Sequence, residues 1–595
     1  MWMTLLALRN SIAILMASLG IAILGFVPLG RLPIRRATEK AAMSRCLAVL
    51  LVGLLLVGLL TAPSFAQAPA PRVTINGLVD FVTTAYRNWS QFSGAPGAPD
   101  PTTGHKEGWY SRERGVFTLT GEVGRVKGVW AIELDFTNGA GSFNASSQPG
   151  SLTTVGKAQN GTSANFDLDT DVQGALETKW LYLETPVTGP GSLLPFIPVT
   201  TIARMGGQPF RGHDYKFGIL ASGDFAGVTL ETTWTPSLRS TVTFVQIGEA
   251  LDRGIALNQK EQIALIASLE ADVWKGLTVK PTYAYAQYHG GNCATTNLGT
   301  EAYGGYDPNS NCPAAVVSVA GSDALARGSV DVPPGVGRHI TRHYLGGDVR
   351  WTMGPFSVQP TFIYLLGQQQ VAPRGSQPGG PRAGQVNDVD VRSFITDTIV
   401  GFRTGPLNIE SRIMYTPGVA ANHDIQNGGG GVIRAYQPID TGFAYMNAWT
   451  EIWVGSIDYT ASFLAPRNAV ILRASPSYDK YGRVFAALAA DYALTPTLTL
   501  RGITNLSWTD TAVDTKGIYL NGILPSGIVS PGNPFRGGKE RYLGNEWVAG
   551  CTYRFAPNMV FDFAAAYLAV GGALDIHSAE AKDVYKVTGR FRITF

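Results

Sequence analysis

The last residues of the chain alternate strictly between apolar and polar side chains. From Tyr585 to Phe595, one set of alternate positions reads Tyr, Val, Gly, Phe, Ile and Phe, and the other reads Lys, Thr, Arg, Arg and Thr. Because side chains on a β-strand point to opposite faces with a period of two, this segment predicts a strand with one apolar and one basic face. A soluble sheet buries such an apolar face, whereas a membrane barrel turns it toward lipid and keeps the polar face on its lumen.

Segments of alternating apolarity recur from Val73 onward, and short connections between them alternate with long ones. Long polar connections are expected at 88–112, 138–175, 290–340, 368–388, 418–445 and 510–540. Tight turns containing Gly, Pro, Asn or charged residues are expected at 124–127, 236–237, 272–275, 354–355, 405–406, 495–496 and 557–558. Short turns at one end and long loops at the other are typical of outer-membrane barrels, whose short turns face the periplasm.

These patterns predict an all-β fold over residues 73–595, namely a transmembrane antiparallel up-and-down β-barrel of about 18 strands, within a range of about 16 to 20. The count depends on the segments 199–208 and 468–474, whose alternation is weaker. After residue 66 no run of about 20 apolar residues occurs, so insertion into a membrane requires a barrel. A large soluble all-β protein is the alternative, and it would leave both ends of the chain unexplained.

Residues 43–66 have the pattern of a secretory signal peptide. A basic start precedes the apolar run 47–60, and small residues at Ser64 and Ala66 predict cleavage after Ala66. We interpret residues 1–42, which contain another apolar stretch, as an upstream extension and favour Met43 as the start of translation. Residues 67–72 then form a short lead into the barrel.

The charge of the exported chain excludes a general affinity for nucleic acids. Removal of residues 1–66 deletes six basic residues and one acidic residue, which changes the formal charge from +3 to −2. A chain with that balance lacks the positive field that nucleic-acid binding requires. We therefore expect an outer-membrane localisation, contact with outer-membrane lipid and no nucleic-acid partner, while assembly into a homo-oligomer stays open.

Two cysteines, Cys293 and Cys312, share one Gly- and Asn-rich loop. Because export brings them to an oxidising compartment, a disulfide between them is expected. Their loop, 290–340, is also the candidate to fold into the lumen and narrow it, or to shield the outer surface. Cys551 lies within a strand pattern and is interpreted as a small apolar filler.

Five tryptophans lie where an aromatic girdle at a membrane interface is expected, near the ends of strands that lead into short turns. They are Trp130, Trp180, Trp234, Trp274 and Trp351.

Charged residues that alternate with apolar ones are candidates for the lumen wall. The early strands contribute acids and the later strands mostly bases, which predicts a pore with a transverse field and mild anion preference. The alternative is that these groups pair across strands, as any polar lumen requires. If the barrel closes, the last strand pairs with 74–86 and brings Asp80 beside its bases. The pore-lining candidates are Asp80, Glu122, Glu133, Asp135, Arg204, Asp348, Arg350, Arg403, Glu410, Arg412, Arg501, Lys586, Arg590 and Arg592.

Several phrases resemble known barrels. Leu543-Gly-Asn-Glu-Trp547, followed by Thr552-Tyr-Arg-Phe, Pro557-Asn, Ala566-Tyr-Leu and Gly571-Gly, is similar to the C-terminal hairpin of alginate-export-type porins, and Arg204-Met-Gly-Gly-Gln-Pro-Phe210 resembles a strand end of such barrels. The closing strand resembles that of bacterial outer-membrane barrels. This resemblance implies that Phe595 is an assembly signal read by the outer-membrane barrel assembly machinery.

Enzymatic, cofactor and metal functions find little support. The seven histidines are scattered without the spacing of a triad, and no Cys-x-x-Cys-His occurs. Asp167, Asp169 and Asp171 resemble the start of a calcium loop, but the loop lacks Gly at its sixth position and has Thr178 at its twelfth. We therefore expect no catalytic residues, no cofactor and no bound metal.

Three functions remain as hypotheses. The first is an outer-membrane channel for passive diffusion of small polar or anionic solutes through a charged lumen. The second, which the resemblance favours, is export of an anionic polysaccharide. The third is a structural or partner-binding barrel without transport, which a lumen filled with bulky apolar groups would favour.

Overall fold

The computed structural model describes the barrel and parts of its connections. The described residues are 70–89, 107–138, 170–172, 176–216, 218–221, 224–248, 262–289, 339–371, 387–419, 432–439, 445–446, 448–453, 455–457, 476–477, 481–513, 539–574 and 581–595. The predicted signal peptide and upstream extension, the predicted strand at 468–474, the calcium-like acids Asp167 and Asp169 and the predicted Cys293–Cys312 disulfide lie outside these residues, and Asp171 lies in β4 with its side chain undescribed.

Nearly all described secondary structure is β. One three-residue 3₁₀ turn, η6 (Gly572–Leu574), is the helical element described over its full length, and no helix among the described residues is long and apolar enough to cross a membrane. The strands are β1 (Arg72–Arg87), β2 (Glu107–Val123), β3 (Val126–Asn138), β4 (Thr170–Val172), β5 (Leu176–Thr188), β6 (Thr200–Pro209), β7 (Asp224–Thr235), β8 (Leu238–Gly248), β9 (Gln262–Trp274), β10 (Leu277–His289), β11 (His339–Met353), β12 (Phe356–Val371), β13 (Asn387–Thr404), β14 (Leu407–Thr416), β15 (Val432–Ile433), β16 (Arg483–Ala493), β17 (Leu498–Val513), β18 (Glu540–Ala556), β19 (Met559–Val570) and β20 (Val584–Thr594).

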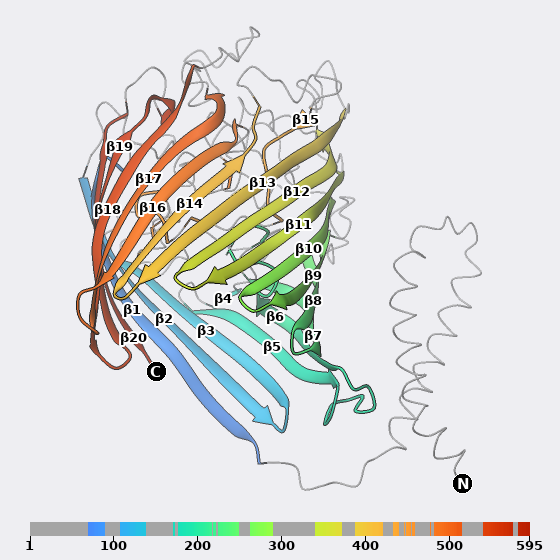
Figure 1. Cartoon of the computed structure of the whole chain (residues 1–595). Coiled ribbons are helices and arrows are strands. Elements are labelled where there is room, and N and C mark those ends of the chain that lie inside the picture. Colours follow the sequence, from blue (N-terminus) through green and yellow to red (C-terminus); the bar gives the residue numbers. More distant parts are fainter. Residues whose placement is uncertain are drawn as a thin grey trace, which may run out of the picture. The chain divides into compact units, whose positions relative to one another are not determined.

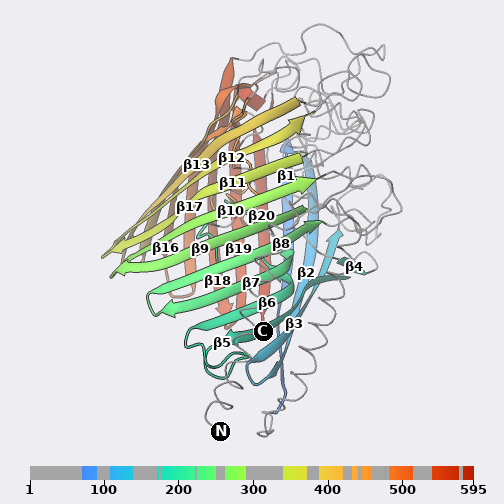
Figure 2. The same ribbon diagram turned by 90° about the vertical axis from the view of Figure 1, so that its right-hand side faces the viewer.

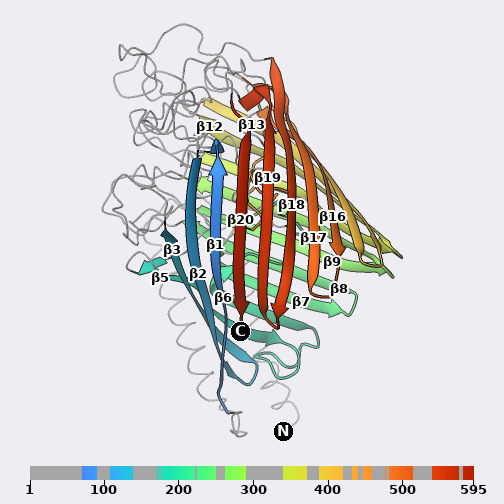
Figure 3. The same ribbon diagram turned by 90° about the vertical axis from the view of Figure 1, so that its left-hand side faces the viewer.

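Consecutive strands pair antiparallel, and the last strand pairs with the first. Figure 2 shows β7 to β13 side by side in chain order, and Figures 1 and 3 show β1 beside β20. The β1–β20 ladder runs from Leu78 opposite Thr594 to Arg87 opposite Tyr585. Apart from the short β4 and β15, eighteen strands form a closed antiparallel barrel, which confirms the predicted fold.

The chain divides into two compact units. Among the described residues, the smaller unit contains Gly121–Lys127 and Thr185–Ile202, and the larger contains nearly all of the remaining strands. Inside the smaller unit a turn is held by the Gly189 N–H, which donates to the Ile197 carbonyl over 3.0 Å. The functional residues discussed below belong to the larger unit unless stated otherwise.

The turn pattern agrees with the prediction at one end of the sheet. Turns of two to four residues join β2 to β3, β7 to β8, β9 to β10, β11 to β12, β13 to β14, β16 to β17 and β18 to β19. The segment 199–208 is a strand, β6, as predicted. Several boundaries were wrong: β2 begins at Glu107, β12 runs to Val371 and β17 runs to Val513, so each takes in residues expected to be loop.

The outward face of the strands is apolar. Large hydrophobic side chains that belong to a core in a soluble protein are exposed here, which is the pattern of a barrel whose outer face meets lipid. They include Phe81, Leu230, Phe244, Leu265, Leu345, Phe362, Ile413, Leu488, Leu500, Val587, Phe591 and Ile593.

Four of the five predicted girdle tryptophans lie exposed beside short turns, namely Trp130, Trp234, Trp274 and Trp351. The prediction for Trp180 was wrong. Trp180 lies near the beginning of β5, at the long-loop end, and its Nε1 donates to Asp224 Oδ1 over 2.6 Å. Alternation alone could not separate a tryptophan that faces lipid from one that serves as a hydrogen-bond donor to a wall carboxylate.

Phe595 completes the seam of the barrel. Its backbone N–H donates to the Gly77 carbonyl over 3.0 Å, and the Gly77 N–H donates to the Phe595 carbonyl over 2.8 Å. The Phe595 ring packs beside Phe117, with ring centroids 5.9 Å apart. The backbone of Phe595 is thus hydrogen-bonded to β1, and its ring lies over Gly77 of the same strand.

Replacing Gly77 by Val should impair closure of the barrel. A Cβ at Gly77 would lie 2.8 Å from Phe595 Cζ and 2.8 Å from the Val116 carbonyl oxygen, so backbone as well as ring must shift, at about 1–3 kcal/mol. Heat-dependent electrophoretic mobility should show a smaller folded fraction. Gly502→Val is the control, because a Cβ there meets nothing within 4 Å. Equal folded fractions for the two variants would contradict this account of the seam.

Candidate functional site in the barrel lumen

The closing strand places a guanidinium on a buried carboxylate, as predicted. Asp80 of β1 lies opposite Arg592 of β20, and Arg592 donates from Nε to Oδ1 over 2.6 Å and from Nη2 to Oδ2 over 2.5 Å. The Asp80 carboxylate has no exposed surface. This bidentate pair joins strands that are 512 residues apart in sequence.

Three further predicted bases, Arg412, Arg590 and Lys586, are also paired. Arg412 donates from Nη2 to Asp397 Oδ2 over 2.6 Å, and Arg590 donates from Nη2 to Asp562 Oδ2 over 2.7 Å. Lys586 Nζ lies 3.2 Å from Glu451 Oε1. The late strands are therefore close to electrically balanced.

Charged side chains on the early strands are also paired, each with two partners of opposite sign. Glu133 forms ion pairs with Arg114 and with Lys179, whose Nζ lies 2.5 Å from Glu133 Oε2. Arg204 lies 3.1 Å from Glu184 and 3.3 Å from Glu231. Many of these charges thus pair with charges on neighbouring strands, which is the alternative that the sequence left open.

The remaining candidates take varied places. Asp348 is buried and accepts the Tyr215 backbone N–H over 3.2 Å. Arg501 is half-buried, 3.6 Å from Asp491, and donates to the Ala448 carbonyl over 2.7 Å. Glu122, in the smaller unit, lies 3.8 Å from Lys127. Asp135 lies in β3, and its side chain is outside the described residues.

Three arginines on the inward face have no carboxylate within 4 Å in the described part of the chain. Arg350 and Arg403 share the inward face of their strands with the buried Asp348 and Asp397, and both are exposed near short turns. Arg554, near the end of β18, is likewise exposed. Glu410 is the one inward-facing predicted carboxylate that is similarly unpaired there. The unpaired charge near the short turns is therefore predominantly positive.

Connections enter the lumen and are bonded to its wall. We call residues 210–221 the first inner segment and residues 445–457 the second inner segment, in each case meaning the described positions. In the first, the His213 ring lies 2.7 Å from Thr243 Oγ1 and 2.8 Å from Ser268 Oγ, on β8 and β9. Thr282 of β10 donates to the His213 carbonyl over 3.2 Å.

The first inner segment continues across three further strands. The Tyr215 N–H donates to Asp348 of β11, as noted above. Lys216 Nζ donates to Thr361 Oγ1 of β12 over 2.5 Å and to the Asp397 carbonyl of β13 over 2.8 Å. Burial lowers the pKa of Lys216 to about 8, against the opposing effect of the nearby Asp397. The segment therefore crosses the inner wall from β8 to β13.

The second inner segment is bonded to the wall from β13 to β20. The Tyr445 hydroxyl donates to Asp397, and Asn505 of β17 donates to the Trp449 carbonyl over 3.0 Å. Glu546 of β18 accepts the Glu451 and Ile452 N–H groups over 2.6 and 2.7 Å. The following contacts also involve β20: Lys586 donates to the Glu451 carbonyl over 2.8 Å, and Arg590 to the Ile457 carbonyl over 3.3 Å.

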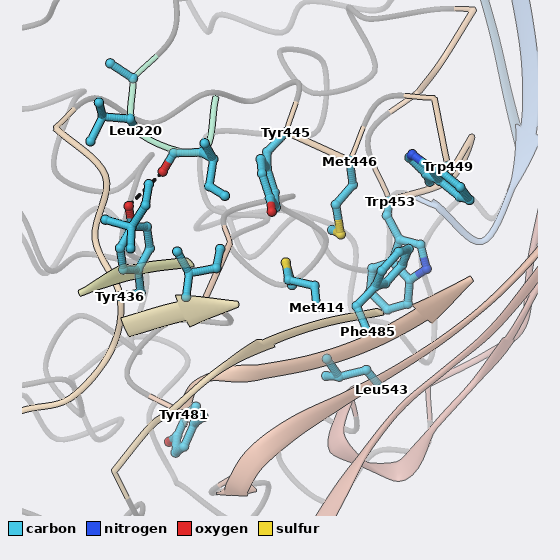
Figure 4. Packing of buried hydrophobic residues seen from close by; sticks show 14 of the residues in the cluster. Leu220, Met414, Tyr436, Tyr445, Met446, Trp449, Trp453, Tyr481, Phe485 and Leu543 are labelled. Carbon is cyan, nitrogen blue, oxygen red and sulfur yellow. Dashed lines mark hydrogen bonds between the residues drawn. The ribbon is translucent and has the colours of Figure 1, made fainter. Parts of the chain in front are cut away.

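Apolar packing fills the part of the lumen near the long connections. Figure 4 shows Leu220, Tyr436, Met446, Trp449 and Trp453 packed with wall residues such as Met414, Phe485 and Leu543. Tyr436 donates to the Ile219 carbonyl over 2.9 Å, and the Ile439 N–H donates to the Leu220 carbonyl over 2.8 Å. The expectation of a polar lumen was wrong for this half of the wall.

The sequence did contain a signal for the second inner segment. The stretch from Tyr445, where the predicted polar connection 418–445 ends, to Trp453 carries three large aromatic residues and Ile452. Large apolar side chains of this kind are usually buried, so their number argues against a solvated loop. The predicted lumen-narrowing loop, 290–340, lies almost wholly outside the described residues.

A cavity of about 700 Å³ remains beside the inner segments. Four cationic side chains and one carboxylate line it, together with four aromatic rings; these are Lys216, Arg412, Arg501, Arg590, Asp562, Tyr215, Tyr445, Trp449 and Phe563. Its lining combines a positive excess with apolar surface. No group of three or more potential metal ligands occurs among the described residues.

His213 should make the stability of the first inner segment depend on pH. Burial, with a smaller effect from Lys280, lowers the pKa of His213 to about 3, below the 6.5 of a free histidine. Neutral His213 therefore contributes stability above the unfolded pKa, and this contribution is lost as the pH falls from about 6.5 toward about 3.

Between about pH 7 and pH 5 the wild-type barrel should lose urea resistance. His213→Gln should be less stable at pH 7 and should lose less over that interval, because the substituted side chain does not titrate. Identical slopes for the two proteins would contradict the assignment of this pH dependence to His213.

A closed barrel of eighteen strands with an apolar outer face and ion-paired charges on its inner wall has the architecture of a transmembrane β-barrel. No family model matches this chain, and no curated protein matches it. The resemblance to alginate-export-type porins therefore stays a prediction.

Solved porins are similar to this chain over most of its length. Pseudomonas aeruginosa OccK5 (OpdH) is 8% identical, with 88% of this chain and 98% of that one covered and a TM-score of 0.40. A BenF-like porin from Pseudomonas fluorescens Pf-5 is 9% identical, with 88% and 98% covered and a TM-score of 0.40. Pseudomonas aeruginosa OpdK, solved with vanillate, is 8% identical, with 87% and 98% covered and a TM-score of 0.37. At these identities the likeness implies no shared solute.

Proposed function

We propose that the protein is an outer-membrane channel for passive diffusion of small polar solutes, with a preference for anions. The observation that carries the proposal is the cavity of about 700 Å³, whose lining has four cationic side chains against one carboxylate. The unpaired Arg350, Arg403 and Arg554 near the short turns support the same sign of selectivity.

The arrangement suits conduction rather than tight binding. Most lumen guanidinium groups already hold a protein carboxylate, so a passing anion meets positive charge that is only partly available. Conduction requires sites that attract a solute and release it again, and partly neutralised cations meet both conditions. The inner segments narrow the lumen and exclude bulky solutes.

A structural or partner-binding barrel without transport is the second candidate. The apolar packing around Tyr436, Trp449 and Trp453 favours it, because a lumen filled with bulky apolar groups obstructs a channel. This packing lies on the long-connection side, whereas the charged cavity is lined largely by residues nearer the short turns.

Electrical recording distinguishes the two candidates. The purified barrel, shown to be folded by its heat-dependent electrophoretic mobility, is inserted in a planar bilayer under a potassium chloride gradient. Stable conductance with a reversal potential toward that of chloride is the expected result. Folded protein without conductance would overturn the channel proposal, and greater permeability to potassium would overturn the anion preference.

A further inference from the structure

One buried carboxylate, Asp397 of β13, is bonded to both inner segments. Its side chain has no exposed surface, and it holds the wall residue Arg412 through Nε at 3.1–3.2 Å and through Nη2 at 2.6 Å. The Tyr445 hydroxyl of the second inner segment donates to Oδ2. Lys216 of the first inner segment lies 4.0 Å from Oδ1 and donates to the Asp397 carbonyl over 2.8 Å.

Asp397 lies on β13, the strand that both inner segments reach. The first inner segment is bonded to strands from β8 to β13, and the second from β13 to β20. In the described part of the chain, Asp397 is the wall residue whose bonds include both. The two segments thus line most of the inner wall and meet at one point.

The segments are held chiefly by side chains. Neither contains a described strand that pairs with the wall, so neither shares in a ladder of backbone hydrogen bonds. Segments with few backbone bonds open at lower free energy than the strands around them. A carboxylate can accept several hydrogen bonds at once, which lets a single wall residue hold donors from both segments and from the wall.

We propose that Asp397 is the joint that positions both inner segments and thereby sets the width of the lumen constriction. The proposal rests on the channel function proposed above for its effect on conductance, but the joint itself is a property of the folded chain. Loss of the donors from Tyr445 and Lys216 should loosen the segments where they meet, while the Asp397–Arg412 pair keeps β13 and β14 together and the other wall bonds of each segment remain.

The test uses the double variant K216M/Y445F, because it removes both segment donors and leaves the wall pair intact. Asp397→Asn is the second variant. Asp80→Asn is the matched control, since Asp80 is equally buried and holds an arginine bidentately, yet has no described bond to either inner segment.

Two readouts are made on each folded variant. The first is single-channel conductance. The second is the rate at which a membrane-impermeant maleimide labels Leu220→Cys, introduced into the wild type and each variant with Cys551→Ser. Leu220 is 1% exposed, so labelling requires the first inner segment to open.

We expect K216M/Y445F to label at least about tenfold faster than the wild type, because hydrogen bonds to charged groups are lost from both segments. Its conductance should be larger and should fluctuate between levels, and Asp80→Asn should be labelled at the wild-type rate. Unchanged labelling in K216M/Y445F and in Asp397→Asn would overturn the joint. Faster labelling without conductance in any protein would uphold the joint and overturn the channel function.

Discussion

Reversing the charge of Arg350, Arg403 and Arg554 together should convert an anion-preferring channel into a cation-preferring one. These guanidinium groups are exposed on the inward face and lack carboxylate partners in the described residues, so their field is not cancelled locally. Replacing all three by Glu changes the lumen charge by six units near the short turns, where ions enter or leave. The reversal potential in a potassium chloride gradient should change sign, because rings of fixed charge govern which ion is concentrated in a pore.

Arg392→Glu is the control for this prediction. Arg392 is exposed on β13 but lies on the opposite face from Asp397, where it pairs with Asp390 over 2.7 Å. A single charge reversal of the same kind outside the lumen should leave the reversal potential near that of the wild type. If the triple variant kept the wild-type selectivity, these arginines would not be the source of anion preference.

Replacing Lys586 by Met should destabilise the barrel by about 3–5 kcal/mol, the cost of leaving a buried charge without its partner. The side chains of Lys586 and Glu451 are both fully buried, and Lys586 bonds both the carboxylate and the backbone carbonyl of Glu451. The urea midpoint of the folded barrel, followed by tryptophan fluorescence, measures the loss.

The double variant K586M/E451Q separates charge from packing. With Glu451 neutralised no buried charge is stranded, so the double variant should recover much of the stability that Lys586→Met loses. The amide oxygen of Gln can still accept the N–H groups of Ser456 and Ile457 that now bond Glu451. Equal stability of the single and double variants would show that the loss comes from Lys586 packing instead.

Period-two alternation predicted the wall of this protein because a strand's faces are determined locally. The pairing of the last strand with the first followed from closure alone, and with it came the contact between Asp80 and Arg592. The other ion pairs could not be predicted, since choosing Asp562 for Arg590 or Asp397 for Arg412 requires the register of neighbouring strands.

The packing inside the lumen was harder to predict than the wall, because the side chains that fill it come from connections between strands. Lys216 reaches Asp397 across 181 residues of sequence, and Glu451 reaches Lys586 across 135. No periodicity relates such residues. Only the aromatic content of the second inner segment hinted that this connection is buried.

By itself the sequence determined an antiparallel barrel with an apolar outer face, short turns at one end and a closing seam at Phe595, since these depend on nearest neighbours in the chain or on closure. Tertiary structure alone decided which charges remain unpaired, where the lumen is packed and which carboxylate holds both inner segments. Those features depend on side chains that the closed ring of strands brings within bonding distance from distant parts of the chain.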